Sequence, residues 1–214
     1  MQNFLAEEAP GKVVCVIGLG NPGAEYRFTR HNAGYRVVGL LAESQKIALR
    51  EGTGEYLFSE FRVDDKRVLL VLPTTYMNES GMAVLQVMEH FSLNVDDLIV
   101  VYDDFQLPLG TLRFRAGGTD GGHNGLASVI YHVQSDKIAR LRLGIAGSTC
   151  PTEDRKDLMA DYVLSPFNKD EGPIAAQTIE HARDALLALT RHGMHYAMNN
   201  FNRSFLENDP KAKQ

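Results

Sequence analysis

Residues 12–32 read KVVCVIGLGNPGAEYRFTRHN, an apolar run rich in valine that stops at a group of three glycines. Similar apolar runs follow at residues 66–72 (KRVLLVL) and 98–102 (LIVVY). Continuous runs of this kind are typical of strands that are buried on both faces, as in a parallel or mixed sheet covered by helices.

Helical patterns alternate with these strands. They cover residues 31–48, 80–91, 124–133 and 173–191, and further strands are indicated at 56–63, 112–115 and 141–145. The alternation predicts a single α/β domain with three layers, in which helices flank a mixed, mostly parallel sheet. We expect this domain to cover residues 12–206, between an N-terminal extension at 1–11 and a frayed tail at 207–214.

The composition is that of a globular protein. The chain has 214 residues, 44 % hydrophobic and 23 % charged, which fits one domain with a sizeable core. No apolar run approaches the roughly 20 residues that span a bilayer, and the first residues lack a secretory signal pattern. Two cysteines, Cys15 and Cys150, do not suggest a disulfide framework. We therefore expect a cytoplasmic protein without a membrane partner.

Charge is distributed unevenly. The net charge is −5, yet residues 111–151 hold five basic and two acidic residues, so this segment is +3 and the rest of the chain is −8. Such a distribution permits a local site for an anion on an otherwise acidic protein.

The glycines of the first loop admit two interpretations. Gly18, Gly20 and Gly23 spell G-x-G-x-x-G after a strand, the signature of a dinucleotide-binding turn. That interpretation requires a second strand ending in an acidic residue roughly 20 positions later, and here a helical pattern follows instead. A sharp turn that brings the backbone close to a substrate explains the glycines better.

Several kinds of chemistry lack their sequence signature. There is no G-x-S-x-G elbow, no phosphate-binding loop of the G-x-x-x-x-G-K-[ST] type, and no cysteine and histidine grouping with zinc spacing. His192 and His195 are more typical of a solvent-facing helix end than of a metal site. We therefore expect neither a metal nor a cofactor.

Polar side chains gather where strands end and loops begin. Four segments carry them: Asn21, Tyr26, His31 and Asn32; Tyr76, Met77 and Asn78; Asp103 and Asp104; and His123 and Asn124. Ligands of open α/β sheets bind beyond the carboxyl ends of the strands, and three of these segments leave such strands directly. The sequence therefore predicts that they converge on one crevice.

Each segment taken singly also has a purely structural interpretation. Asn78 can cap a helix, and the pair at 103–104 can cap a turn or hold magnesium. His31 can be a partly buried histidine satisfied by the backbone, and the loop around His123 can be a flexible connection to a helix.

Together the segments are far more specific. GLGNPGAEYRFTRHNAG, PTTYMNESGMAV, YDDFQLPLGTLRFRAGG and GGHNGLASVI, in this order and spacing, closely resemble the bacterial-type peptidyl-tRNA hydrolases. RLRLGIAG and YVLSPF are also similar to that family, and the resemblance covers residues 13–203.

The resemblance implies a monomeric enzyme without an obligate protein partner that acts on peptidyl-tRNA released prematurely from ribosomes. The bond cut would be the ester joining the peptide to the terminal adenosine of the tRNA CCA end. By the same resemblance His31 is catalytic, Asp103 is its partner, and Asn21, Asn78 and Asn124 surround the scissile ester. Met77 and Tyr76 would contact peptide or terminal base, although Met77 is equally explained as core, and Tyr26 and His123 complete the predicted substrate-binding set.

The chemistry of these residues agrees with this assignment. Hydrolysis without a covalent nucleophile needs a base with a pKa near neutrality, which suits histidine. A carboxylate such as Asp103 can fix its tautomer and stabilise the imidazolium. A carboxamide N–H₂ from an asparagine can donate to the developing oxyanion, and we favour Asn21 as the residue that holds water or the ester. Asn78 and Asn124 then hold the peptide backbone and the product carboxylate, although these roles can be exchanged.

The substrate also accounts for the basic segment. Arg113 and Arg115 would project on one face of a strand, as would Arg140 and Arg142 on theirs, and arginine suits phosphate oxygens. The family comparison places acceptor-stem phosphates near Arg115, Arg142 and one of Arg155 or Lys156. Contacts confined to the phosphate backbone would make recognition largely independent of tRNA sequence.

Two positions depart from the family pattern. Gln106 stands where relatives often have Asp, and Asp120 puts a carboxylate beside the proposed phosphate path. Two alternatives to the esterase remain: a non-catalytic RNA-binding protein on the same fold, and a dinucleotide-dependent oxidoreductase. Retention of His31, Asp103 and the three asparagines favours the enzyme.

Overall fold

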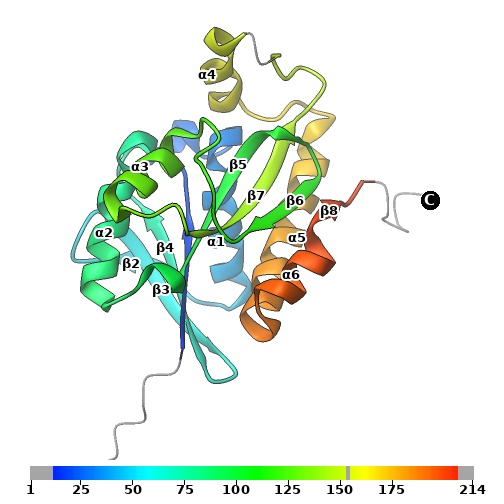
Figure 1. The fold of residues 1–214 in the computed structure, drawn as a ribbon. Helices are drawn as coiled ribbons and strands as arrows, with labels where there is room; N and C mark the ends of the chain where they lie inside the picture. The colour runs from blue at the N-terminus through cyan, green and yellow to red at the C-terminus, as the bar shows by residue number, and fades with distance from the viewer. Residues whose placement is uncertain (1–11, 153–154, 207–214) are drawn as a thin grey trace, which may run out of the picture.

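The valine-rich run at the start of the chain forms β1 (Val13–Gly18), next to the middle of an eight-stranded sheet. In this computed structural model, residues 12–152 and 155–206 are described (Figure 1). The predicted extension at 1–11 and the predicted tail at 207–214 lie outside the described residues.

The sheet has the strand order β2-β3-β4-β1-β5-β7-β6-β8. The remaining strands are β2 (Arg50–Glu51), β3 (Tyr56–Val63), β4 (Lys66–Pro73), β5 (Leu98–Pro108), β6 (Thr111–Arg115), β7 (Ala139–Ala146) and β8 (Arg203–Ser204). The central strands β4, β1, β5 and β7 pair in parallel, and the outer strands pair antiparallel. The predicted mixed sheet is confirmed, with its parallel pairs confined to these four central strands.

Helices cover both faces of the sheet (Figure 1). One face carries α1 (Ala33–Ser44), α5 (Glu171–His192) and α6 (Met194–Phe201), and the other carries α2 (Ser80–Phe91) and α3 (Asn124–Val133). Along β1, Val14 and Val16 pack with the first group while Cys15 and Ile17 pack with the second. Such alternation explains the continuous apolar run and confirms the three-layer domain. No helix in the described part of the chain is long and apolar enough to cross a membrane.

Glycines let α1 begin directly against the sheet. A Cβ on Gly34 would lie 2.2 Å from the carbonyl oxygen of Val101, and one on Gly18 would lie 2.5 Å from the carbonyl oxygen of Gly34. Gly23 has a φ of 112°, a conformation that disfavours other residues. The glycine-rich segment is thus a close helix-to-sheet crossing and a turn, which place the residues just before α1 at the carboxyl edge of the sheet.

Strand β5 is longer than its apolar run predicts. Asp103 and Asp104 lie inside β5, not after it, and they pair with Leu143 and Gly144 of β7. Aspartate is depleted in strands, so the local pattern ended the strand too early. Pairing with β7 overrides that preference and fixes both carboxylates on a rigid element.

Candidate active site

His31 and Asp103 form a hydrogen-bonded couple at the carboxyl edge of the sheet. Asp103 extends β5 beyond its pairing with β1, and His31 lies in η2 (Arg30–Asn32), the 3-10 turn that leads into α1. His31 Nδ1 lies 2.9 and 3.0 Å from the two carboxylate oxygens of Asp103. Both residues are buried, at 8 % and 2 % exposure. A carboxylate only accepts hydrogen bonds, so Nδ1 of His31 carries the proton and Nε2 keeps its lone pair.

His123 is a second donor to the same carboxylate. Its Nε2 lies 3.1 Å from Oδ1 of Asp103, while its Nδ1 accepts a hydrogen bond from the backbone N–H of Leu126 and so caps α3. Because Nδ1 accepts, Nε2 must carry the proton in the neutral ring. Both nitrogens of His123 are therefore engaged within the protein, and the residue braces Asp103.

The electrostatics follow from burial and this pairing. Burial alone would raise the pKa of the Asp103 carboxyl, but the charges and hydrogen bonds of His31 and His123 outweigh burial and lower it. Burial alone would lower the pKa of His31, but the charge and hydrogen bond of Asp103 raise it above its ordinary value of 6.5. The couple therefore combines a carboxylate that is ionised at neutral pH with an imidazole whose pKa lies above its ordinary value.

Asn21 has its amide orientation fixed by the backbone of the neighbouring segment. Its Oδ1 accepts a hydrogen bond of 2.8 Å from the N–H of Met77, so its N–H₂ group is left to donate elsewhere. The backbone of Asn21 is held by Asn32, whose side chain accepts from Asn21 N at 2.8 Å and donates to Asn21 O at 2.9 Å. Asn32 was predicted only as a member of this polar segment, and the structure shows that its side chain holds the backbone of Asn21.

A cavity of about 580 Å³ joins part of the predicted set. Its lining comprises His31, Asp103, Phe105, Gln106, Gly121, Gly122, His123, Asn124, Met159, Ala160 and Val163. Three of these lie on α4 (Lys156–Leu164), a helix that the sequence analysis missed and that projects at the top of the molecule (Figure 1). The apolar residues of α4 that line the cavity share it with the polar residues His31, Asp103, His123 and Asn124.

Several predicted residues are not among the described residues that line this cavity, and Asn21 lines a separate cavity with Asn32. Met77 is 4 % exposed and packs in the core against Gly125, so the core interpretation of Met77 holds. Asn78 is exposed in η3 (Met77–Glu79) and does not cap α2. Tyr26 is half-buried at the end of the short turn before η2, and Tyr76 is 57 % exposed.

The departures at 106 and 120 lie in different settings. Gln106 is one of the residues that line the cavity, and its backbone N–H, which any residue there except proline would offer, donates to Oδ1 of Asp104 at 2.8 Å. Asp120 accepts from the N–H of Gly122 at 2.8 Å and so shapes the glycine loop. Among the described residues, neither the Gln106 nor the Asp120 side chain forms a hydrogen bond with His31.

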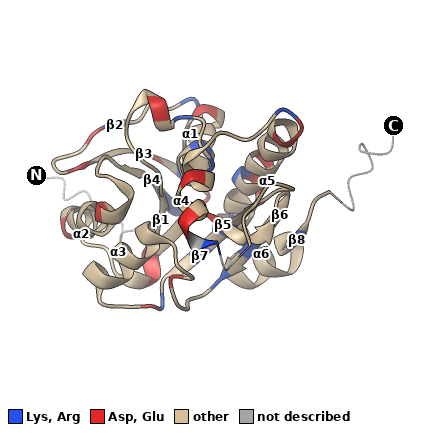
Figure 2. Cartoon of the chain, turned by 90° about the horizontal axis from the view of Figure 1, so that it is seen from above, with Lys and Arg blue, Asp and Glu red and all other residues tan. Residues whose placement is uncertain are grey.

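The predicted basic residues differ in their availability. Arg113 lies opposite Arg142, and Arg115 opposite Arg140, on the paired strands β6 and β7. Figure 2 shows basic stretches, in blue, near β7 and α6. Arg142 is ion-paired with Asp104, and the buried Arg140 donates to backbone carbonyls, among them that of Thr119 at 2.8 Å.

Arg113 and Arg115 have no carboxylate partner among residues 12–152 and 155–206. Arg155 is exposed and pairs with Asp157, whereas the side chain of Lys156 lies outside what the structure describes. The free cations of the strand pair are thus those of β6.

His31, Asp103 and His123 also form the one group in the described part of the chain with the composition of a metal site. The backbone N–H of Leu126 decides between the two possibilities, because it occupies the lone pair of His123 Nδ1 and leaves a proton on Nε2. A protonated nitrogen cannot ligate a cation. The donor set therefore fits a hydrogen-bonded relay better than a metal centre.

Comparison with known proteins gives one consistent result. A family model described as peptidyl-tRNA hydrolase matches residues 15–211. A peptidyl-tRNA hydrolase of Salinibacter ruber is 45 % identical over 186 residues, which cover 87 % of this chain and 96 % of that protein. One from Finegoldia magna is 39 % identical over 187 residues with the same coverage of both chains. The crystal structure of peptidyl-tRNA hydrolase from Acinetobacter baumannii superposes with a TM-score of 0.82 at 30 % identity, over 92 % of this chain and 98 % of that one.

Proposed function

This chain belongs to the peptidyl-tRNA hydrolase family, and from that membership we propose how its residues share the work of hydrolysing peptidyl-tRNA. The reaction is hydrolysis of the ester between a peptide, or an N-blocked aminoacyl group, and the 3′-terminal adenosine of tRNA, which recycles the tRNA. The proposal concerns which side chain performs which step.

His31 is the base that activates water. With Nδ1–H held on Asp103, the free lone pair of Nε2 takes a proton from a water molecule as its oxygen attacks the ester carbonyl carbon. The ester C–O bond then breaks, and the imidazolium returns the proton to the departing ribose oxygen. Asp103 stays ionised throughout and stabilises the imidazolium.

Two groups are suited to the carbonyl oxygen and the peptide. The N–H₂ of Asn21, fixed by the Met77 backbone, stabilises the developing oxyanion, a contribution of about 3 kcal/mol for one well-placed donor. Asn124 lines the cavity at the start of α3 and is suited to the peptide backbone or the product carboxylate. Asn78 and Tyr76 are exposed and would contact the substrate beyond the cavity. The half-buried Tyr26 completes the proposed binding set.

The acceptor stem of the tRNA would lie along β6. Arg113 and Arg115 offer two guanidinium groups without a carboxylate partner in the described residues, and phosphate oxygens are suitable acceptors. Arg142 is already paired with Asp104, so it would reach a phosphate only by leaving that carboxylate. Arg155 precedes α4 directly.

One observation carries the proposal: a buried carboxylate receives Nδ1 of His31 on both oxygens, which leaves the other ring nitrogen as the base. The test is release of labelled N-acetyl-aminoacyl groups from N-acetyl-aminoacyl-tRNA, in EDTA, by the wild type and His31→Ala. We expect rapid release by the wild type and a loss of at least about 100-fold in the variant, the lower end for a general base.

Equal rates in both proteins would contradict the assignment of His31 as base while leaving the hydrolase. No release by the wild type, with tRNA still bound, would instead indicate a non-catalytic RNA-binding protein.

A further inference from the structure

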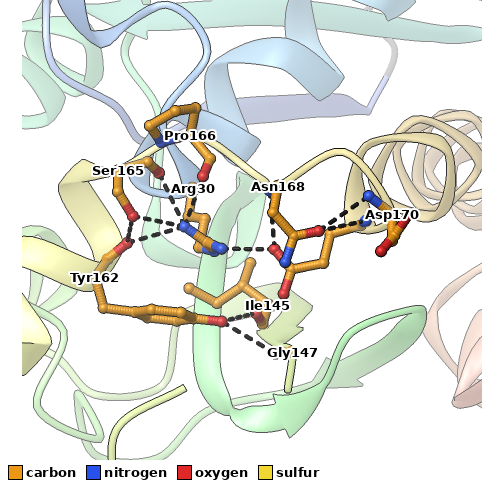
Figure 3. A network of polar contacts seen from close by, with 9 residues as sticks. Arg30, Ile145, Gly147, Tyr162, Ser165, Pro166, Asn168 and Asp170 are labelled. Atoms are coloured by element: carbon orange, nitrogen blue, oxygen red, sulfur yellow. Dashed lines mark hydrogen bonds and ion pairs between the residues drawn. The ribbon is translucent and has the colours of Figure 1, made fainter. Parts of the chain in front are cut away.

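Arg30, the residue before His31, is a charged side chain that the reaction does not use and that is nevertheless buried at 3 % exposure. Its guanidinium donates to the carbonyl oxygens of Tyr162, Ser165 and Pro166 at 3.3, 3.2 and 2.8 Å and to Ser165 Oγ at 2.6 Å. It also pairs with the carboxylate of Glu171 at 2.6 Å. Figure 3 shows Arg30 beside Tyr162, Ser165 and Pro166, which belong to the end of α4 and the segment that follows it, and Glu171 is the first residue of α5.

The backbone of η2 is joined to the same segment. The N–H of Arg30 donates to the carbonyl of Ser165 at 3.1 Å, and Thr29 forms a β-bridge with Pro166. Helix α4 packs against η2, which contains His31. The position of α4 is therefore set relative to the proposed base itself, over a sequence separation of more than 130 residues.

A second attachment joins α4 to the sheet. The hydroxyl of Tyr162 donates to the carbonyl of Ile145 at 2.7 Å and accepts from the N–H of Gly147 at 3.0 Å (Figure 3). The ring of Tyr162 lies 4.2 Å from the Arg30 guanidinium, in a cation–π contact. Both attachments act on the C-terminal half of the helix, so its cavity-facing residues are positioned from one end.

The chemistry of this network specifies arginine. Its planar guanidinium reaches carbonyls, a hydroxyl and a carboxylate in different directions while its face lies on an aromatic ring, which a lysine ammonium cannot do. A cation beside the last carbonyls of a helix is also favoured by the helix dipole. Buried ion pairs add little net stability compared with well-packed apolar residues, so stability alone does not explain the charge.

The helix held in this way supplies the apolar wall of the cavity. Met159, Ala160 and Val163 face the side on which His31 and Asn124 lie. An apolar surface opposite a polar catalytic wall can accept side chains of different shapes, and methionine adapts readily to them. It is suited to the side chain of the residue that is esterified to the tRNA.

We propose that Arg30 is a positioning residue for substrate selection: it fixes α4 so that the apolar wall meets the side chain of the esterified residue beside His31. This inference rests on the proposed function, because it places the scissile ester at His31. It adds that affinity for substrates with large apolar side chains depends on the Arg30–Glu171 pair.

The test compares N-acetyl-leucyl and N-acetyl-glycyl groups carried on the same tRNA, for the wild type, Arg30→Lys and Glu171→Gln. We expect KM for the leucyl substrate to rise about tenfold, as the loss of a partly buried leucine contact would cause. KM for the glycyl substrate and kcat for both should change by less than about threefold, because the base is untouched.

Equal KM changes for the two substrates would overturn the inference, since the wall would then contact a part they share, such as the terminal adenosine. A loss confined to kcat, or no change in discrimination, would overturn it as well. The activity of His31→Ala in the same assay tests the proposed function separately, because that variant should lose kcat for both substrates.

Two further variants distinguish a specific effect on the position of α4 from a general loss of folding. Tyr162→Phe removes only the hydroxyl attachment and leaves the contacts of Arg30, so it should lower leucyl over glycyl discrimination by a smaller factor. Arg67→Gln breaks an exposed ion pair with Glu60 on the other half of the sheet and should leave discrimination unchanged. If Arg30→Lys does not fold, Glu171→Gln and Tyr162→Phe decide the matter, and unchanged discrimination in both contradicts the inference.

Discussion

Asp103→Asn should inactivate the enzyme through the tautomer of His31, and the structure specifies why. An asparagine offers one carbonyl oxygen and one N–H₂ group in place of two accepting oxygens. His123 must donate from Nε2, because the N–H of Leu126 occupies its Nδ1, so it claims the carbonyl of Asn at 103. The N–H₂ group then takes the place of Oδ2, 3.0 Å from Nδ1 of His31, and Nδ1–H could keep an acceptor only by sharing Oδ1 with His123. A donor that faces Nδ1 favours the tautomer with the proton on Nε2, and in that tautomer His31 cannot act as the base.

The magnitude follows from what a base contributes. General base catalysis supplies about 10²–10⁴-fold, and the corresponding change in Ser-His-Asp triads costs about 10⁴ in kcat for the same tautomeric reason. We expect kcat for N-acetyl-aminoacyl-tRNA to fall by about 10³-fold, with KM nearly unchanged because the carboxylate is buried beneath the histidines.

The double variant Asp103→Asn/His123→Ala tests whether His123 causes this loss of activity. Without His123 the asparagine can rotate and give its carbonyl to His31, so the loss caused by Asp103→Asn should be at least about tenfold smaller in that background. Single-turnover rates of the four proteins measure this coupling, and denaturant unfolding checks the loss of the α3 cap, worth about 1 kcal/mol. Equal losses in both backgrounds would refute the argument, as would an Asp103→Asn enzyme with near wild-type kcat.

Four further outcomes are expected. The kcat/KM should rise with pH as His31 loses its proton, with an inflection above 6.5 because Asp103 raises its pKa; a pH-independent rate would contradict this. The pKa of the Asp103 carboxyl is lowered, so its ionised form stabilises the fold fully above the ordinary value of 3.8, and this stabilisation is lost as the pH falls through the lowered pKa. The free energy of unfolding of Asp103→Asn should therefore fall less steeply with decreasing pH than that of the wild type. Replacing Arg113 and Arg115 by Gln should weaken tRNA binding and reduce its salt dependence by about one counterion per arginine, with Arg67→Gln as the matched control. Gly34→Ala should destabilise the fold by about 1–3 kcal/mol in urea unfolding, because its Cβ would meet the carbonyl of Val101.

Much of the scaffold is legible in the sequence because its strands are buried on both faces. The apolar runs of β1 and β4 reflect the two apolar layers that these strands enter, and the helical pattern predicted at residues 173–191 reflects the one layer that α5 enters. The pairing of His31 with Asp103 was likewise predictable once the order of motifs was recognised. The bracing role of His123 was not, because it depends on which ring nitrogen the N–H of Leu126 occupies.

Other features depend on contacts between distant segments. Helix α4 has little amphipathic pattern, because it packs on η2 and otherwise borders the cavity, so its sequence carries a weak signal. Arg30 reads locally as a surface charge, yet its partners lie more than 130 residues away. Arg142 reads as a phosphate ligand, but Asp104 lies on the neighbouring strand and pairs with it. Only the folded sheet brings these groups together.

The most direct test of the central claim is the ¹⁵N NMR titration of the His31 ring, assigned by comparison with His31→Ala. We expect neutral His31 to carry its proton on Nδ1, and Nε2 to titrate with a pKa above 6.5. A neutral ring protonated on Nε2 would show that this nitrogen cannot accept a proton from water, and would contradict the proposed role of His31.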